Sequence, residues 1–360
     1  MFDYLHVSDD IAVRVQSDDM RTTVENIFRH LGLPSQDAQR SADALLYADL
    51  HGIDSHGVSN MLRFYVGLLQ KGTINPAPVM KVITDAPAVA TVDSDNGLGL
   101  TVGPQAMHLA MEKAETCGIG AVAVANGQHF GAAGYHAQLA LERDMIGVAM
   151  TQGGVYMLPT YGATSMLGVN PIGFAAPARG EAPFIFDAST SSVAVNKIIL
   201  ARRLGVNIPG SWIANTDGTP VMEEGPPPDD FRMLPVGGTR EIGSHKAYGL
   251  AVMADILCGL LSGGGPGFAN REHICHHFIA YRIDAFTDIE AFKDNMDLYM
   301  KGLRECDPAP GHERVLYAGL PEYETYQDRS VNGIPYHPEV IEWFRKKTAE
   351  LGVEHRLGND

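Results

Sequence analysis

The sequence predicts an α/β fold in which helical segments from both ends of the chain accompany a central sheet. Three observations predict it. Residues 17–72 carry apolar side chains at helical spacing, punctuated by glycines. From residue 88 onward the pattern changes to short apolar runs that are typical of buried strands, and helical stretches separate some of these runs. Alternation of strands and helices is characteristic of an α/β sheet.

The N-terminal part of the chain is expected to contain three helices. The first covers 17–31 and ends at Gly32, the second covers 35–52, and the third starts near Ser55 and reaches Gly72. Glycine is favoured just beyond a helix because it adopts the left-handed conformation without a steric cost. The segment TINPAP that follows is expected to be a linker.

Four apolar segments predict buried strands. They are AVATVDS, GAVAVAN, MIGVAMTQ and PFIFDAS, which begin at residues 88, 120, 145 and 183. Helices are expected over 104–118 and 134–144, where they separate the first three strands. Further along, we expect a long apolar helix over 245–267, a late strand over 276–286 and a final helix over 337–351. The segment MEEGPPPDD is expected to be a surface loop, because its prolines disfavour regular structure.

Composition narrows the classes of function. The chain has 360 residues, enough for two domains or one large fold. Its formal net charge of −16 argues against a nucleic acid partner, because a phosphate backbone would be repelled. The four cysteines form no CxxC pair, which is typical of reduced thiols in a cytoplasmic protein. We expect no signal peptide and no membrane span, since no apolar run reaches about 18 residues.

The glycine-rich segment GLGLTVG at 97–103 is a candidate Rossmann dinucleotide site. The G-x-G-x-x-G pattern requires a glycine at position 102, where this chain has Val102. The strand that follows should end in an acidic residue for the ribose hydroxyls, but it ends at Asn126. A glycine-rich turn therefore explains the segment better than a Rossmann site does.

The segment DSHGVS offers a candidate group for proton transfer. If Ser55 caps the third helix, His56 lies in the first turn, where the helix N-terminus lowers and Asp54 raises the pKa of the imidazole. These opposing effects predict titration near neutrality, which suits a general acid or base. Asn60 and Arg63 would share the same helix face and could bind a small acid. The alternative is a capped helix start with an incidental surface histidine.

Polar residues also follow two of the predicted strands. His129 precedes the small-residue helix start FGAAGYH, whose open N–H groups could bind an anion. Asp187 could accept hydrogen bonds from ribose hydroxyls, and Ser189 and Thr190 could donate to a phosphate. A turn histidine and a helix cap are the alternatives. The cluster HICHH at 273–277 lacks partners at zinc-ligand spacing, so we expect no metal site.

Five segments in a fixed order show a resemblance that covers residues 17–345. They are DLHGIDSHGVSNMLRFYVGLLQKGTINP, NGQHFGAAGYHAQLA, YGATSMLGVNPIGFAAPA, FDASTSSVAVNKI and HKAYGLAVMADILCGLLSG. In this order they resemble the type 2 malate/L-lactate dehydrogenase family, the sulfolactate-dehydrogenase-like oxidoreductases. Relatives include ureidoglycolate dehydrogenase, diketogulonate reductase and piperideine-carboxylate reductase.

The resemblance implies an oxidoreductase that uses NAD or NADP and transfers hydride between the nicotinamide and C2 of a small 2-hydroxy or 2-oxo acid. It implies a non-Rossmann α/β fold, with a mixed sheet and flanking helices, and a homodimer whose active sites lie near the subunit contact. Residues 1–85 with 300–360 would form a helical region for substrate binding and dimer contacts. Residues 86–299 would form the α/β cofactor-binding domain.

Carried over by position, the SHG and HFG segments supply catalytic candidates, which are Ser55, His56 and His129. The serine would orient the histidine, and either histidine could be the main acid–base group. The resemblance places the substrate near three residues, which are Asn60, Arg63 and Thr160. It implies cofactor contacts for Gln152, Gly153, Asp187, Ala188, Ser189, Gly237, Gly238 and Gly319.

The chain departs from the family pattern at two places. Many relatives carry an arginine four residues after the SHG histidine, where it binds the substrate carboxylate, whereas this chain has Asn60. A neutral amide cannot form that bidentate charged pair, so either Arg63 takes the task or the substrate differs. The Pro-Gly-Glu turn of relatives is Ala318-Gly319-Leu320 here, which removes a carboxylate. Two other functions stay open: reduction of cyclic imino acids, and nicotinamide binding without catalysis.

Overall fold

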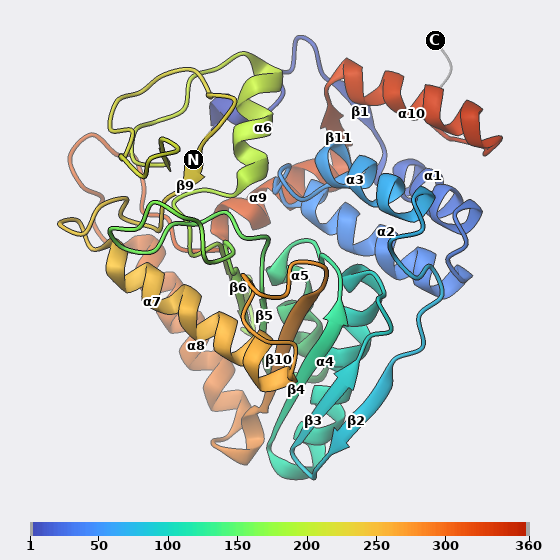
Figure 1. The fold of residues 1–360 in the computed structure, drawn as a ribbon. Helices are drawn as coiled ribbons and strands as arrows, with labels where there is room; N and C mark the ends of the chain where they lie inside the picture. Colours follow the sequence, from blue (N-terminus) through green and yellow to red (C-terminus); the bar gives the residue numbers. More distant parts are fainter. Residues whose placement is uncertain (1–2, 358–360) are drawn as a thin grey trace.

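The computed structural model describes residues 3–357 and is built around a mixed sheet of seven strands (Figure 1). The strand order is β2-β3-β4-β10-β5-β6-β7. β3 and β4 run parallel, and the other neighbours in this sheet pair antiparallel. The bounds are β2 (Lys81–Asp85), β3 (Val89–Asp93), β4 (Ile119–Gly127), β5 (Met145–Thr151), β6 (Ile172–Ala176), β7 (Phe184–Ala188) and β10 (Ile274–Arg282). The predicted α/β fold with a mixed sheet is confirmed.

The four strands predicted from apolar runs are all present, as β3, β4, β5 and β7. The late strand is present as β10, but it stops at Arg282, where the 3₁₀ turn η4 (Ile283–Ala285) begins. Two strands of the seven-stranded sheet escaped prediction. β2 is an edge strand that is exposed along its whole length, so it shows no apolar pattern. β6 is short and follows Pro171, which conceals it in a segment rich in turn residues.

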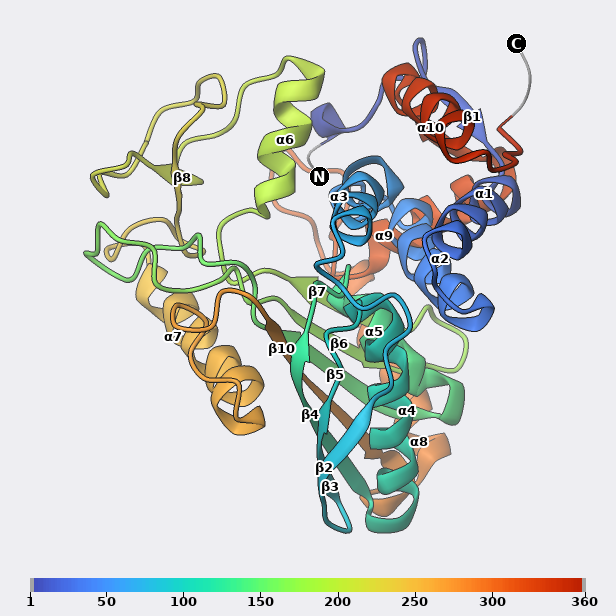
Figure 2. The same ribbon diagram turned by 45° about the vertical axis from the view of Figure 1, so that its right-hand side comes forward.

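Helices cover both faces of the sheet, as Figure 2 shows most clearly. α4 and α5 pack on one face against β4, β5, β6 and β10, while α7 and η3 pack on the other face. The predicted helix over 245–267 is α7 continued by the π-helical η3, and helical structure stops before the glycines at 263–265. The bounds are α4 (Gly99–Cys117), α5 (Ala133–Gln138), η2 (Leu139–Arg143), α7 (Ser244–Asp255), η3 (Ile256–Leu260) and α8 (Ile289–Glu305).

The two ends of the chain form a second, mostly helical layer at one end of the sheet (Figure 1). β1 pairs with β11, α1 packs on α2 and α10, and α2 packs on α9. α3 begins at Val58, later than the start predicted near Ser55. The bounds are η1 (Asp3–Leu5), β1 (Val13–Val15), α1 (Ser17–His30), α2 (Ser35–Leu50), α3 (Val58–Gln70), α9 (Leu320–Asn332), β11 (Ile334–Tyr336) and α10 (Pro338–Leu351).

Of the two expected domain boundaries, the one at 85/86 lies between neighbouring strands of the same sheet, and the one at 299/300 lies within α8. Residues 81–85, expected in the helical region, form strand β2 of the sheet, and α8 crosses position 300. The division into two domains stays a prediction. Residues between β7 and α7 are mainly irregular and include α6 (Val195–Leu204), β8 (Ile213–Ala214) and β9 (Arg232–Met233). Within the described part of the chain, no helix has the length and apolar character needed to cross a membrane.

The core is tightest where α4 lies on β4. A Cβ atom added to Gly120 would overlap the carbonyl oxygen of Ala110, and it would lie 2.8 Å from the backbone nitrogen of Ala114. Backbone atoms of a packed helix cannot yield as a flexible side chain can. Glycine at position 120 therefore sets how closely this helix approaches the sheet.

This close approach leads to a test by substitution. Gly120→Ala should lower the free energy of unfolding by about 1–3 kcal/mol or more, because the helix must move away from the strand. The matched control is Gly302→Ala in α8, where no atom lies within 4 Å of the added Cβ. That change should raise stability by about 0.5–1 kcal/mol, since alanine is the better helix former. Denaturant unfolding measures both, and equal effects would contradict the packing argument.

Candidate active site

A cavity of about 950 Å³ lies where the helical layer meets the end of the sheet. Its wall is formed by the loop between α2 and α3, the start of α5, the end of β7, the start of α6 and the start of α9. The N-terminal residues Leu5 and His6 also line it. The cavity brings together several residues that the sequence singles out, which are Ser55, His56, Asp187, Ala188, Ser189 and Gly319.

The loop between α2 and α3 presents Ser55 and His56 to the cavity. The Ser55 hydroxyl does not cap α3; its Oγ lies 2.8 Å from Nδ1 of His56. The cap comes from α2 instead, because the Val58 N–H donates to Oδ2 of the Asp49 carboxylate at 3.1 Å. A Cβ on Gly57 would overlap that carboxylate, so only glycine fits between the two helices. The expected cap at Ser55 is therefore wrong, and this serine orients the neighbouring imidazole.

Burial decides the protonation of His56. The pKa of its imidazole is lowered to about 4, first by burial and then by the positive charge of Lys197. The prediction of titration near neutrality is wrong, because it weighed only the helix terminus and Asp54. The Asp54 carboxylate faces Arg329 and His6 rather than the imidazole. His56 is consequently a neutral imidazole at pH 7, which can accept a proton.

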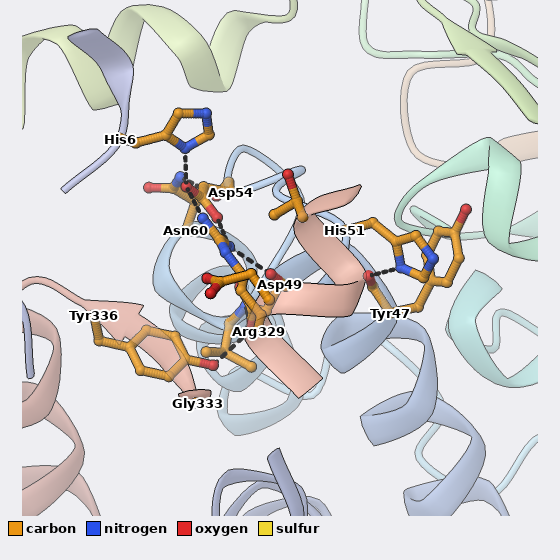
Figure 3. Close-up of polar contacts among 12 residues, drawn as sticks. His6, Tyr47, Asp49, His51, Asp54, Asn60, Arg329, Gly333 and Tyr336 are labelled. Atoms are coloured by element: carbon orange, nitrogen blue, oxygen red, sulfur yellow. Dashed lines mark hydrogen bonds and ion pairs between the residues drawn. The ribbon is translucent and has the colours of Figure 1, made fainter. Parts of the chain in front are cut away.

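A buried ion pair between Arg329 and Asp54 anchors this loop, as the close-up in Figure 3 shows. The Arg329 guanidinium of α9 donates to both Asp54 oxygens, at 2.6 and 3.4 Å, and to the main-chain oxygen of Asp49. His6 Nδ1 lies 2.7 Å from the second Asp54 oxygen. Burial alone would raise the pKa of Asp54, but His6 and Arg329 outweigh it and hold that pKa below its ordinary value. Asp54 is thus a stable anion.

Asp49 completes the anchor. Tyr336 of β11 donates its hydroxyl to Oδ2 of Asp49 at 2.9 Å (Figure 3). Burial, and then the charge of Asp54, raises the pKa of Asp49 to about 7. Both aspartates therefore depend on groups that come from the last forty residues of the chain or its first six, and the catalytic loop is held by both chain ends.

His129 lies behind His56 rather than on the described cavity wall. The two imidazole rings are nearly parallel, with their centroids 5.9 Å apart. The Gly131 N–H and the Tyr65 hydroxyl both donate to Nδ1 of His129, at 3.2 and 2.6 Å, so the ring proton sits on Nε2. Burial, followed by the neighbouring His56, lowers the pKa of His129 to about 3. His129 is therefore a neutral hydrogen-bond donor.

Asp187 occupies the anion position that the sequence predicts at the start of α5. The Gly134 N–H donates to Oδ2 of Asp187 at 2.7 Å, so the open N–H groups of this helix bind a carboxylate of the protein itself. Burial raises the pKa of Asp187 to about 6, with a further contribution from Glu322. The hydroxyls of Ser189 and Thr190 donate to the backbone oxygens of Ser191 and Val169.

The residues predicted to hold a substrate carboxylate lie elsewhere. Arg63 forms an ion pair with Glu339 of α10 at 2.6 Å and lies over the ring of Trp343. Asn60 donates its side-chain N–H to the main-chain oxygen of Asp54 at 2.8 Å (Figure 3). Both side chains thus stabilise contacts within the helical layer, and neither is among the residues that line the described cavity.

Other predicted residues lie farther from the catalytic loop. Gln152 donates to the Asp255 carboxylate of α7 at 2.8 Å, beside η3, and Gly153 follows it. Thr160 lies in an irregular segment with its hydroxyl buried and unpaired. Gly237 and Gly238 form a turn with positive φ angles, next to Val236 on the cavity wall.

The sequence reasoning missed several side chains on the cavity wall. Two are cations, Lys197 of α6 and Arg21 of α1. Three form an aromatic stack, in which the His51 ring lies 4.0 Å from that of Tyr47 and 4.9 Å from that of Tyr326. The spacing of Tyr47 and His51, four residues apart in a predicted helix, was a usable signal. The position of Tyr326 carried none, because only the tertiary structure brings α9 here.

The cavity fits a dinucleotide. Its volume lies at the upper end of the roughly 300–1,000 Å³ that ligand sites occupy. The small residues Gly131, Ala132 and Ala133 allow close approach of a ligand, the aromatic stack offers a face for a base, and Arg21, which pairs with Asp43, offers a cation to a phosphate. Among residues 3–357, no group of three or more His, Cys, Asp or Glu side chains is arranged to hold a metal ion.

The chain is similar to proteins of known activity over most of its length. A family model described as malate/L-lactate dehydrogenase matches residues 15–345. The malate dehydrogenase of Pyrococcus abyssi is 39% identical over 353 residues, which cover 96% of this chain and 97% of that protein. The L-sulfolactate dehydrogenase of Methanocaldococcus jannaschii is 34% identical over 337 residues, 91% of this chain and 94% of that protein.

A solved structure shows the same fold. The malate dehydrogenase of Pyrococcus horikoshii OT3 superposes with a TM-score of 0.89 at 34% identity, over 97% of this chain and 99% of that chain. The similarity spans the sheet, the helical layer and the loop that carries Ser55 and His56. The chain therefore belongs to the malate/L-lactate dehydrogenase family, and it is an oxidoreductase that acts on the CH–OH group of hydroxy acids.

Proposed function

We propose that the protein interconverts a small 2-hydroxy acid and the corresponding 2-oxo acid, with NAD or NADP as the hydride carrier. The observation that carries this proposal is the neutral imidazole of His56, held by Ser55 on the wall of a cavity that fits a dinucleotide. When bound, the nicotinamide would accept the hydride that leaves C2 of the hydroxy acid. The remaining chemistry is proton transfer and binding of the substrate's charge.

His56 is the better candidate for the proton transfer. With its ring proton on Nδ1 and donated to Ser55, the imidazole presents a basic Nε2 that takes the proton of the substrate hydroxyl. In the reverse direction the protonated ring returns that proton to the carbonyl oxygen. His129 cannot take this role in the same state, because its Nδ1 already accepts two hydrogen bonds and its Nε2 carries the proton. We assign His129 to shielding and orienting His56.

Lys197 takes the place of the missing arginine in this proposal. It lines the cavity and lies close enough to His56 to lower the pKa of that imidazole. A carboxylate bound to the ammonium group would bring C2 of the substrate beside His56. Arg63 is held by Glu339 and Trp343. The proposal therefore moves carboxylate recognition from α3 to α6.

Oligomeric state and location belong to the proposal as well. A homodimer is supported by exposed apolar side chains along α7 and η3. These side chains are Leu250, Met253, Ile256 and Leu260. All four cysteines are free thiols, which supports a reducing, cytoplasmic compartment.

Cofactor and substrate are tested together. Thermal unfolding with NADH and with NADPH should show a larger stabilisation by one of them, because the shift grows with RT ln(1 + [L]/Kd). The preferred cofactor is then assayed with 2-hydroxy acids, 2-oxo acids and cyclic imino acids by nicotinamide absorbance. Turnover of the acids supports the proposal. Turnover of the imino acids alone would favour imine reduction, and cofactor binding without any turnover would favour a non-catalytic relative.

Replacing His56 should abolish most of the turnover. His56→Ala is expected to lower kcat by roughly 10²- to 10⁴-fold, the usual contribution of a general acid–base group. His30→Ala, on the exposed end of α1, is the matched control and should leave kcat unchanged. Steady-state kinetics of the purified variants measure both. Normal turnover of His56→Ala, with His129 intact, would remove His56 from this role.

The pH profile follows from the lowered pKa of His56. The base must be neutral to accept a proton, so its active form is present above the folded-state pKa of about 4. For oxidation, kcat/KM should stay free of a histidine limb from roughly pH 8 to roughly pH 5 and decline only as the pH approaches that value. An acid limb centred near the ordinary value of 6.5, lost in His56→Ala, would contradict the burial argument.

Lys197→Met tests carboxylate recognition. Loss of the charged hydrogen bond should raise KM for the hydroxy acid by roughly 10- to 100-fold, the equivalent of about 1.5–3 kcal/mol. Lys346→Met, on the exposed face of α10, is the control and should leave KM unchanged. Titration with cofactor alone, followed by thermal shift, separates the loss of substrate binding from the loss of cofactor binding. An unaltered KM would show that another group binds the substrate carboxylate.

A further inference from the structure

The loop that carries the catalytic candidates is anchored by side chains from other parts of the chain, and several of them bind one residue, Asp54. Residues 51–57 join α2 to α3, and Gly52 turns the chain with a φ of +73°. Its own backbone hydrogen bonds are short-range, such as those from Ile53 to Ala48 and from His56 to Ile53. A loop held only in this way would move readily. Long-range contacts come from Asp54, immediately before Ser55, and from the main-chain oxygen of Ser55, which accepts from the Asn196 side chain of α6 at 2.8 Å.

Asp54 is held from three directions. Its carboxylate accepts from Arg329 of α9 and lies 2.7 Å from Nδ1 of His6, and its main-chain oxygen accepts from Asn60 of α3 (Figure 3). The partners come from the N-terminal segment, from α3 and from the C-terminal part of the chain. Any displacement of Asp54 is transmitted directly to Ser55 and His56, which follow it in the chain.

Arg329 makes the strongest of these contacts. Its side chain is 5% exposed, and its guanidinium donates to the Asp54 carboxylate and to the main-chain oxygen of Asp49. A buried guanidinium requires partners of fixed geometry, because water cannot replace a lost hydrogen bond. The planar fork therefore fixes where Asp54 lies relative to α9.

The ion pair is one of several contacts that α9 makes. That helix also packs on α2, and Glu324 in the same helix forms an exposed bidentate pair with Arg314. A buried ion pair adds little net stability compared with apolar packing, since desolvation offsets the attraction. The position of the ion pair indicates a role in the site, because its acceptor, Asp54, directly precedes Ser55 and His56 in the chain.

We propose that Arg329, acting through Asp54, is a positioning residue that holds His56 at the distance and orientation required for proton transfer. The inference rests on the proposed function of His56 as the acid–base group. Arg329 does not line the described cavity, so its effect reaches the substrate only through the loop. It therefore acts on turnover rather than on substrate binding.

The test is a comparison of kcat with KM. Arg329→Met removes the charge and keeps much of the side-chain length. It should lower kcat roughly 10- to 100-fold, as a misplacement of about 1 Å does, with KM changed by less than about threefold. Arg329→Lys keeps the charge but not the fork and should recover part of kcat. The matched control, Arg314→Met, removes the exposed pair to α9 and should leave kcat unchanged.

A double-mutant cycle separates positioning from general stability. If Arg329 works through His56, adding Arg329→Met to His56→Ala should change the residual rate by less than about twofold. If Arg329→Met does not fold, Asp54→Asn replaces it in the cycle, because the amide keeps the shape and loses the charge. Thermal unfolding of each variant confirms that the assay temperature lies below its transition.

The possible outcomes are distinct. A lower melting temperature with normal kcat in the folded variant would overturn the inference and leave the ion pair a structural one. Equal losses of rate in the wild-type and His56→Ala backgrounds would overturn it too. Normal turnover of His56→Ala would instead refute the proposed function, whatever Arg329→Met does.

Discussion

The contact between Arg329 and Asp54 is the constraint on which the geometry of the site depends. It joins a helix near the C-terminus to a loop that follows the second helix of the chain. The pairing of β1 with β11 brings these distant segments together, and Tyr336 of β11 reaches Asp49 in the same network. The catalytic loop is thus held by residues almost three hundred positions away in the sequence. The helical layer serves the site by making these contacts possible.

Burial, more than local helix geometry, sets the charge state of the site. It lowers the pKa of His56 and His129 and raises that of Asp49 and Asp187, so each group is shifted toward its neutral form. Asp54 is the exception, because Arg329 and His6 compensate its charge. The positive charge of Lys197 lies near enough to His56 to lower the pKa of that imidazole, and in the proposed function it is the charge that binds the acidic substrate.

Asn60 takes a structural role in the loop between α2 and α3. Its amide N–H supports the main-chain oxygen of Asp54, which an arginine directed at a substrate would not do. In the proposed function, Asn60 keeps this contact while Lys197, near His56, binds the substrate carboxylate. Packing also explains why position 57, the glycine of SHG, requires glycine. The Asp49 carboxylate that caps α3 leaves no room for a Cβ at Gly57.

The sequence by itself determined the fold class and most of the buried strands, because apolar periodicity is a local property. The local pattern predicted a helix cap for Ser55, and only the family resemblance implied its pairing with His56. The sequence could not reveal β2, whose side chains are all exposed, or β6, which is short and follows a proline. The cap of α3, the partner of Asp54 and the pKa of His56 were decided only by the tertiary structure. Each of these depends on groups from distant segments or on exclusion of water. Neither distant contacts nor burial can be recognised from the neighbouring residues in the sequence.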